Sequence, residues 1–335
     1  MEPLGAEAAP VRCELLVGDA AALYYLGRHG ESREVAERAL AVAGSTAEPY
    51  LLGLAHMHLE MAHSAVLDVD GARAHADAAI AHFTASGHHR NLGAALSNIG
   101  LTEMHAGRWD DALADYRGAA AAAAQAGDVA GVAVAELNQG FLLLRRGELA
   151  EADRLGVRSQ RAFDALGMDD IAAYGRYLRS RVAAADGASA EATALMAEAR
   201  AAFVRSGSGA MVVDCDVATV DALARAGRPG EAVAFARSIE AAVARCGDPI
   251  VAVTFGLHRA LAELRNGDTA LGRDRLLLAL VAAREHRLPY DVHRCLAALV
   301  DLDDSGGPPA PQGARDESRA LATRLGLAPG SPRIS

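Results

Sequence analysis

Two groups of side chains in this sequence could carry chemistry, and the first is a group of histidines. Eight of the 12 histidines fall between His56 and His105, and His56, Glu60 and His63 follow an i, i+4, i+7 spacing. On a helix this spacing places three side chains on one face, where imidazoles and a carboxylate are competent zinc ligands. The chain has no HExxH motif. We therefore predict no bound metal, and keep a metal site or a pH-responsive patch as alternatives to solvated histidines.

The second group combines arginine with tyrosine. Tyr174, Tyr177 and Arg181 follow an i, i+3, i+7 spacing, which places them on one face of a helix. A guanidinium group can bind a carboxylate through two parallel hydrogen bonds, so this segment could hold an anionic or aromatic ligand group. Ordinary solvated arginines are the alternative.

The sequence contains no motif for covalent or acid–base catalysis. All 33 basic residues are arginines, which excludes a phosphate-loop lysine, a Schiff-base lysine and a lysine general base. A GxSxG sequence is absent, and the acidic pair Asp110 and Asp111 is typical of a helix start. An enzyme on a helical scaffold stays as an alternative, but we expect a protein that is not an enzyme and needs no cofactor.

The composition of the chain argues against two classes of partner, nucleic acids and membranes. A net charge of -10 without any basic run argues against direct binding of nucleic acid. The four cysteines form no CxxC pair, and no apolar run approaches the roughly 18 residues of a membrane span. The N-terminus also lacks a basic patch followed by an apolar stretch. We expect a cytoplasmic protein that contacts no membrane.

Glycine recurs with a period of 40 residues, which indicates the elements that position these side chains. Two series lie 20 residues apart: Gly107, Gly147, Gly187, Gly227 and Gly267, and Gly87, Gly127, Gly167, Gly207 and Gly247. Glycine adopts the left-handed backbone at helix ends, so two glycines per period predict stacked two-helix repeats. A small residue early in each second helix marks seven helix pairs: Ala36, Ala76, Ala112, Ala152, Ala192, Ala232 and Gly272.

One repeat is especially regular, in the segment 98–119, NIGLTEMHAGRWDDALADYRGA. It combines a small residue in the first helix, a glycine turn, an aromatic residue and further small residues at helical spacing: Gly100, Gly107, Trp109, Ala112, Tyr116 and Ala119. This pattern resembles the tetratricopeptide repeat (TPR). The next segment, 138–159, keeps four of the same offsets, and the resemblance covers about residues 12–300. The long repeats are similar to the C-terminal sensor arrays of bacterial, including actinobacterial, ATPase-linked transcriptional regulators.

The resemblance and the period together predict an all-α fold. We expect a right-handed α-solenoid of about seven TPR-like helix pairs plus a C-terminal helix. The array would span residues 1–302, and the Gly/Pro-rich segment 303–313 would be a linker because it cannot continue a helix. Residues 314–335 would form a capping helix and tail. The tail, with Arg333 and Ile334, could instead occupy the concave face.

The resemblance also implies where a ligand binds. In TPR arrays the first helices of successive repeats line a concave face that holds extended peptides. The corresponding candidates here are Asn98, Asn138, Arg145, Tyr174, Tyr177, Arg181, His58 and His105. The two asparagines could hydrogen-bond a ligand backbone, or could simply cap or solvate an inner helix face. Without lysine, the lysine-based carboxylate clamp of chaperone-binding relatives cannot form.

These observations favour a binding protein. We expect a non-enzymatic, cytoplasmic protein- or peptide-binding TPR module that acts as a scaffold or regulatory adaptor through its concave face. The alternative is a ligand-sensing TPR domain of a transcription or signalling regulator, either standalone or cut from a longer chain. Homo-oligomers through exposed helix faces remain an option.

Overall fold

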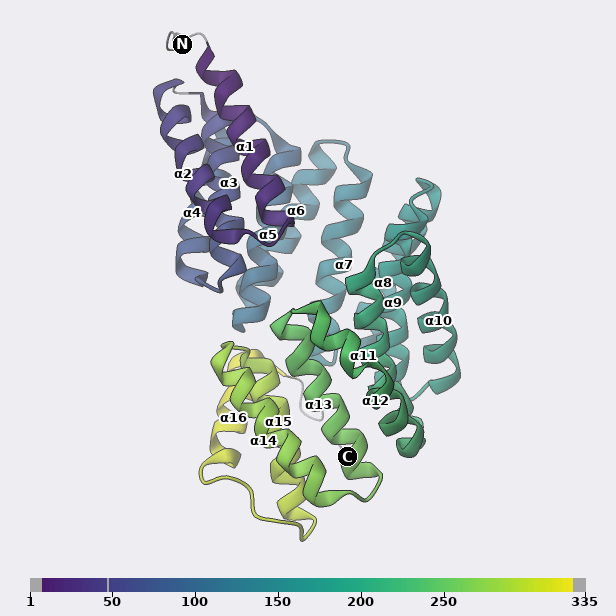
Figure 1. The fold of residues 1–335 in the computed structure, drawn as a ribbon. Helices are drawn as coiled ribbons and strands as arrows, with labels where there is room; N and C mark the ends of the chain where they lie inside the picture. Colours follow the sequence, from purple (N-terminus) through teal and green to yellow (C-terminus); the bar gives the residue numbers. More distant parts are fainter. Residues whose placement is uncertain (1–7, 47, 328–335) are drawn as a thin grey trace. The chain divides into compact units, whose positions relative to one another are not determined.

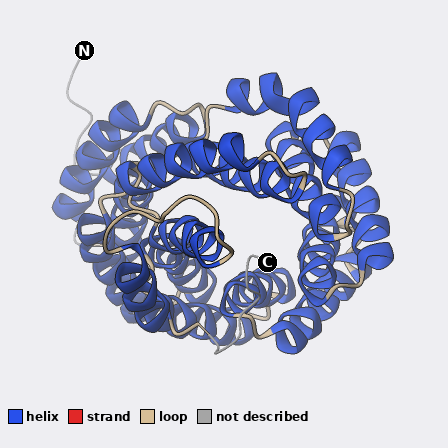
Figure 2. Ribbon diagram, turned by 90° about the horizontal axis from the view of Figure 1, so that it is seen from below, coloured by secondary structure: helices blue, strands red, loops and turns tan. Residues whose placement is uncertain are grey.

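Sixteen α-helices follow one another in the computed structural model, which describes residues 8–46 and 48–327 (Figure 1). Within these ranges there is no strand, and the described loops between the helices are tan in Figure 2. The helices are α1 (Ala9–Tyr25), α2 (His29–Thr46), α3 (Pro49–Ala65), α4 (Val69–Ser86), α5 (His89–Ala106), α6 (Trp109–Gln125), α7 (Val129–Arg146), α8 (Leu149–Ala165), α9 (Asp169–Asp186), α10 (Ser189–Arg205), α11 (Gly209–Arg225), α12 (Pro229–Cys246), α13 (Pro249–Arg265), α14 (Thr269–Glu285), α15 (Pro289–Asp304) and α16 (Ala314–Leu325).

The helices pack as TPR-like pairs, which confirms the predicted α-solenoid. Each odd-numbered helix begins a pair, and α3 with α4, α5 with α6 and α9 with α10 are among the most extensive contacts. Odd-numbered helices also contact the next odd-numbered helix, as α3 does with α5 and α11 with α13. We therefore call the odd-numbered helices the inner helices and the even-numbered ones the outer helices.

Both glycine series lie at helix ends, as predicted. All ten glycines have a positive φ, between 66° at Gly127 and 92° at Gly267. A side chain at such a φ would meet its own backbone, so this residue type sets the turn after each helix. The 40-residue period in the sequence is thus the spacing of these turns.

Small residues within the helices mark where neighbouring helices touch, both within a pair and between pairs. A Cβ placed on Gly100 would lie 2.8 Å from the Tyr116 ring of the partner helix. At Gly175 it would lie 3.0 Å from the backbone oxygen of Gly156. Both distances are too short for a larger side chain, so these glycines permit close approach of the helix axes.

Gly18 and Gly27 both have room for a Cβ, but only Gly27 has a positive φ. Substituting each of them therefore distinguishes the effect of helix propensity from the effect of turn geometry. Gly18 lies inside α1 with no atom near the position of a Cβ, and we expect Gly18→Ala to stabilise the protein by about 0.5–1 kcal/mol. Gly27 is equally open but has a φ of 74°, and Gly27→Ala should cost about 1 kcal/mol. Urea unfolding measures both changes. Equal effects of the two substitutions would contradict this explanation.

The array ends in one helix more than predicted. Six of the seven expected pairs are in contact, α1 with α2, α3 with α4, α5 with α6, α9 with α10, α11 with α12 and α13 with α14, and α15 and α16 form a further, shorter pair. Helix α16 packs on the preceding helices through buried Ala314, and Glu317 accepts a hydrogen bond from Arg284 at 2.6 Å. The possible concave-face contacts of Arg333 and Ile334 lie outside the described residues.

The chain divides into two compact units, residues 1–138 and 139–335. The boundary falls within α7, inside the array expected at 1–302. Unit 1 has a core around Phe83, and unit 2 has cores around Phe203 and Leu276. Every helix in the described ranges is too short or too polar to serve as a membrane span.

Candidate functional site

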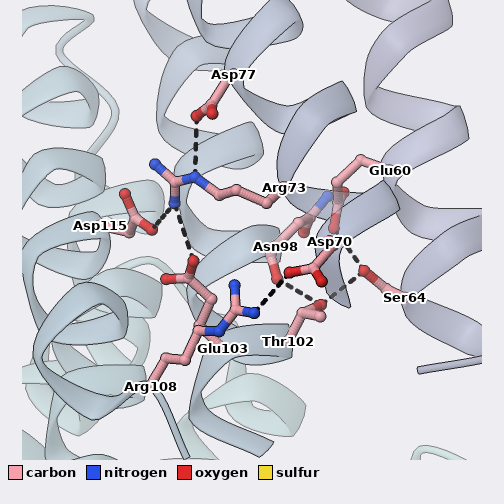
Figure 3. Close-up of polar contacts among 10 residues, drawn as sticks. All are labelled: Glu60, Ser64, Asp70, Arg73, Asp77, Asn98, Thr102, Glu103, Arg108 and Asp115. Carbon is pink, nitrogen blue, oxygen red and sulfur yellow. Dashed lines mark hydrogen bonds and ion pairs between the residues drawn. The ribbon is translucent and has the colours of Figure 1, made fainter. Parts of the chain in front are cut away.

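A buried carboxyl group joins two inner helices of unit 1. Glu60 on α3 is only 1% exposed, and its Oε1 accepts a hydrogen bond of 2.8 Å from the Ser64 hydroxyl (Figure 3). Thr102 on α5 donates to Ser64 at 2.6 Å, and the Asn98 side chain also hydrogen-bonds to Glu60. Burial raises the pKa of Glu60 to about 7, although these hydrogen bonds oppose the shift. The candidate Asn98, on the inner helix α5, therefore binds a carboxyl group of the protein itself.

A second polar network of unit 1 joins three consecutive helices. Arg73 on α4 donates to Asp115 on α6 at 2.6 Å and to Glu103 on α5 at 3.2 Å, and pairs with Asp77 at 2.9 Å (Figure 3). Burial raises the pKa of Glu103 to about 7 despite the nearby Arg73. Because Arg73 uses its donors on three protein carboxylates, this network holds helix pairs together and is not a ligand site.

The histidines do not converge as a metal site. His56 and His63 both turn toward His75 on α4: the Nδ1 atoms of His56 and His75 lie 3.0 Å apart, and the rings of His63 and His75 are 5.2 Å apart. Glu60 points to Ser64 instead. Burial and the neighbouring His75 and His82 lower the pKa of His56 to about 4, so it is neutral at pH 7. Among the described residues no group of three or more potential ligands could hold a metal ion.

Three further candidates from the sequence lie apart from this chemistry. His58 on α3 is 8% exposed, and burial lowers its pKa. His105 is half-buried in the last turn of α5, and Asn138 is half-buried on α7. All three lie on inner helices, but the structure does not join them into one constellation.

In unit 2 the structure brings arginines and tyrosines together. Arg181 on α9 donates to the Tyr177 hydroxyl at 3.1 Å, with its guanidinium carbon 5.8 Å from that ring. Arg145 on α7 and Arg294 on α15 both lie over the Tyr290 ring, at 5.4 and 5.7 Å. We call these five residues the arginine–tyrosine cluster. They come from the inner helices α7, α9 and α15.

Tyr174 does not belong to this cluster. Its ring packs edge to face on Phe203 of the outer helix α10, with centroids 4.8 Å apart. Tyr290 and Arg294 belong to the cluster but were missed from the sequence. A signal was available, because Tyr290 and Arg294 repeat the i, i+4 spacing of Tyr177 and Arg181.

Buried charges adjoin the cluster. Burial works to lower the pKa of Arg181, but Tyr177, Asp221 and Tyr290 raise it above its usual value, so this guanidinium stays charged. Asp221 on α11 is 9% exposed, and its Oδ2 accepts a hydrogen bond of 2.8 Å from Arg225. Burial alone would raise the pKa of Asp221, but His258, Arg225 and Arg294 lower it. Asp221 is therefore an anion among these cations.

His258 on α13 and Asp214 on α11 also have shifted pKa values. Burial lowers the pKa of His258 on α13 to about 3, so its imidazole is neutral. Its Nδ1 donates to the Val217 carbonyl oxygen at 3.2 Å. Burial raises the pKa of Asp214 on α11 to about 6, and Arg181 opposes this shift. The inner helices of unit 2 thus hold a dense set of charged groups away from bulk water.

Hydrogen-bonding capacity remains on these buried groups. Within the described part of the chain, no partner meets Oδ1 of Asp221, Nε2 of His258 or, in unit 1, Oε2 of Glu60. Buried polar atoms normally find partners, so each such atom calls for an explanation. The arrangement can bind polar groups from outside the protein.

Comparisons with known proteins identify the fold only. No protein-family model and no curated protein matches this sequence. A Rap protein complexed with competence and sporulation factor shares the fold with a TM-score of 0.70 and 9% identity, over 96% of this chain and 88% of that chain. The apo form of RapI has a TM-score of 0.64 and 9% identity, over 81% of this chain and 97% of that chain. The protein is therefore a helical repeat protein.

Proposed function

We propose that this chain is a non-enzymatic binding module that holds a peptide or protein segment on its inner helices and acts as a cytoplasmic scaffold or regulatory adaptor. The observation that carries this proposal is the unfilled hydrogen-bonding capacity of buried groups on inner helices, at Glu60, Asp221 and His258. A polar ligand lying on the inner helices of unit 1, or on those of unit 2, would supply the missing partners in that unit. Direct contact with nucleic acid or a membrane forms no part of the proposal.

The structural likeness supports binding as the role of this scaffold. One similar structure is a Rap protein complexed with competence and sporulation factor. A stiff array of helix pairs can receive an extended segment with little change of its backbone. We extend this binding role to the present chain as a proposal, with its own inner-helix side chains as the contacts.

A sensor domain of a transcription or signalling regulator is the second candidate. The name of the factor in the Rap complex favours it, because competence and sporulation are regulated processes. The actinobacterial ATPase-linked regulators suggested by the repeat length remain a hypothesis of this kind. In that role the ligand would change the affinity for a second protein, whereas a scaffold would hold its partner without one.

A defined peptide library tests the binding proposal. We would select a synthetic library of random linear hexapeptides on the protein and compare it with the triple variant Asn98→Ala, Asn138→Ala, Arg181→Ala. The matched control carries three exposed outer-helix changes, Gln125→Ala, Arg205→Ala and Arg237→Ala. We expect the wild type and the control to retain the same peptides, and the triple variant to bind them at least about tenfold more weakly. Equal binding by all three proteins would overturn the inner-helix site.

A further inference from the structure

We propose that the arginine–tyrosine cluster is an anion subsite that receives one carboxylate group of the ligand. This inference rests on the proposed function, because it names the chemistry by which the inner helices of unit 2 would recognise a peptide. The carboxylate would be the C-terminus of the peptide or an acidic side chain.

The first step is that the guanidinium groups of the cluster are not used by protein carboxylates. Among the described residues, Arg145 and Arg181 form no ion pair: Arg145 lies over the Tyr290 ring, and Arg181 lies over the Tyr177 ring and donates to its hydroxyl. The carboxylate nearest to Arg294 is that of Asp291, at 3.9 Å, which is too long for a hydrogen bond. Three guanidinium groups therefore keep donors for a ligand.

Other arginines of the same unit are arranged differently. Arg259 and Arg275 donate to the buried carboxylate of Glu263, at 3.2 and 2.8 Å. Arg200 binds Asp216 at 2.6 Å. Arg200, Arg259 and Arg275 thus have carboxylate partners within hydrogen-bonding distance, unlike Arg145 and Arg181 of the cluster.

The tyrosine beside Arg181 adds a neutral donor. The Tyr177 oxygen accepts a hydrogen bond from Arg181, so its own hydrogen remains to be donated. The side chain is 7% exposed, and burial raises the pKa of Tyr177, which keeps the phenol protonated. An anion beside Arg181 would receive a hydrogen bond from each residue, and such charge-assisted bonds are the strongest available to a protein.

The local charge favours an anion. Arg145, Arg181 and Arg294 lie in the cluster, Arg225 and Arg265 lie beside Asp221, and together they outnumber the nearby carboxylates Asp214, Asp221 and Asp291. A single carboxylate adds one negative charge beside Asp214 and Asp291, whereas a phosphate dianion adds two. These carboxylates therefore repel the dianion more strongly.

Fluorine NMR tests the subsite without knowledge of the natural ligand. The chain has seven tyrosines, so 3-fluorotyrosine labelling gives few signals, and Tyr177→Phe and Tyr290→Phe assign the two that matter. The probes, added at constant ionic strength, are N-acetyl-diglycine with one carboxylate, its amide with none, and inorganic phosphate. We expect saturable shifts of the Tyr177 and Tyr290 signals with N-acetyl-diglycine, none with the amide, and weaker binding of phosphate.

Matched variants connect the shifts to the arginines. Arg181→Gln and Arg145→Gln should each weaken the binding of N-acetyl-diglycine about tenfold. Arg237→Gln, an exposed change on the outer helix α12, should leave it unchanged. Circular dichroism shows whether each variant is folded. If Arg181→Gln does not fold, Arg145→Gln provides the test, because Arg145 is only half-buried.

Each other outcome has a definite meaning. Equal shifts with the amide, or tighter binding of phosphate, would overturn the carboxylate assignment. No shift with any probe would overturn the anion subsite, while peptide selection could still succeed through other inner helices. Saturable shifts without any selected peptide would support the subsite and count against the proposed function.

Discussion

Replacing Glu263 by alanine is expected to destabilise the protein by about 3–5 kcal/mol, the largest effect of any single change considered. Glu263 on α13 is fully buried, and its carboxylate accepts hydrogen bonds from Arg259 of the same helix and Arg275 of α14. Arg259 is itself only 6% exposed. Removing the carboxylate leaves the buried Arg259 with only the exposed Glu240 as an ion-pair partner, and this penalty exceeds the loss of the hydrogen bonds themselves.

Glu240 provides the control because it binds the same arginine from the surface. Its Oε1 lies 2.7 Å from Nη1 of Arg259, but the Glu240 side chain is 57% exposed. Glu240→Ala should therefore cost less than about 1 kcal/mol, since water can replace an exposed partner. The free energy of unfolding in urea, followed by circular dichroism, measures both variants. Similar losses for both would mean that the buried position of Glu263 does not decide its contribution.

The repeat architecture was predictable because it depends on local chemistry. A glycine such as Gly127 is required wherever the backbone turns left-handed, whatever lies around it. A small residue such as Gly100 is required wherever two adjacent helices touch. Both requirements recur with each repeat, so the sequence displays them as a period. The final helix α16 was predicted, but α15 was not, because it follows the seventh predicted pair and is not itself followed by a further regular repeat.

The candidate site was less predictable because its contacts join distant segments. Arg145 meets the Tyr290 ring although they lie on α7 and α15, and that contact depends on how successive pairs are stacked within unit 2. Helical spacing correctly predicts which residues lie on the same face of a helix, but it does not predict which neighbouring helix packs against that face. His56 and Glu60 illustrate this limit: one contacts His75 on α4, and the other hydrogen-bonds to Ser64 and to Asn98 on α5.

The Glu60→Gln variant is expected to be more stable than the wild type at about pH 8, by on the order of 2–3 kcal/mol, and nearly equal to it at about pH 4.5. Burial raises the pKa of Glu60 to about 7, from an ordinary value of 4.5. The folded protein therefore holds this proton more tightly than the unfolded chain. The resulting stabilisation is fully present below the unfolded value and is lost as the pH rises through about 7. Glutamine keeps the shape without ever ionising.

Glu34 on α2 is the control for this comparison, since its side chain is exposed. Glu34→Gln should change the free energy of unfolding by less than about 0.5 kcal/mol, and equally at both pH values. Urea unfolding at the two pH values distinguishes the variants, and a Glu60→Gln effect that does not change with pH would show that Glu60 is not the group that binds the proton. Because Asn98 hydrogen-bonds to Glu60, ionisation of this carboxyl would also strengthen its hold on the Asn98 amide. A ligand that needs Asn98 should then bind Glu60→Gln with an affinity less dependent on pH than that of the wild type.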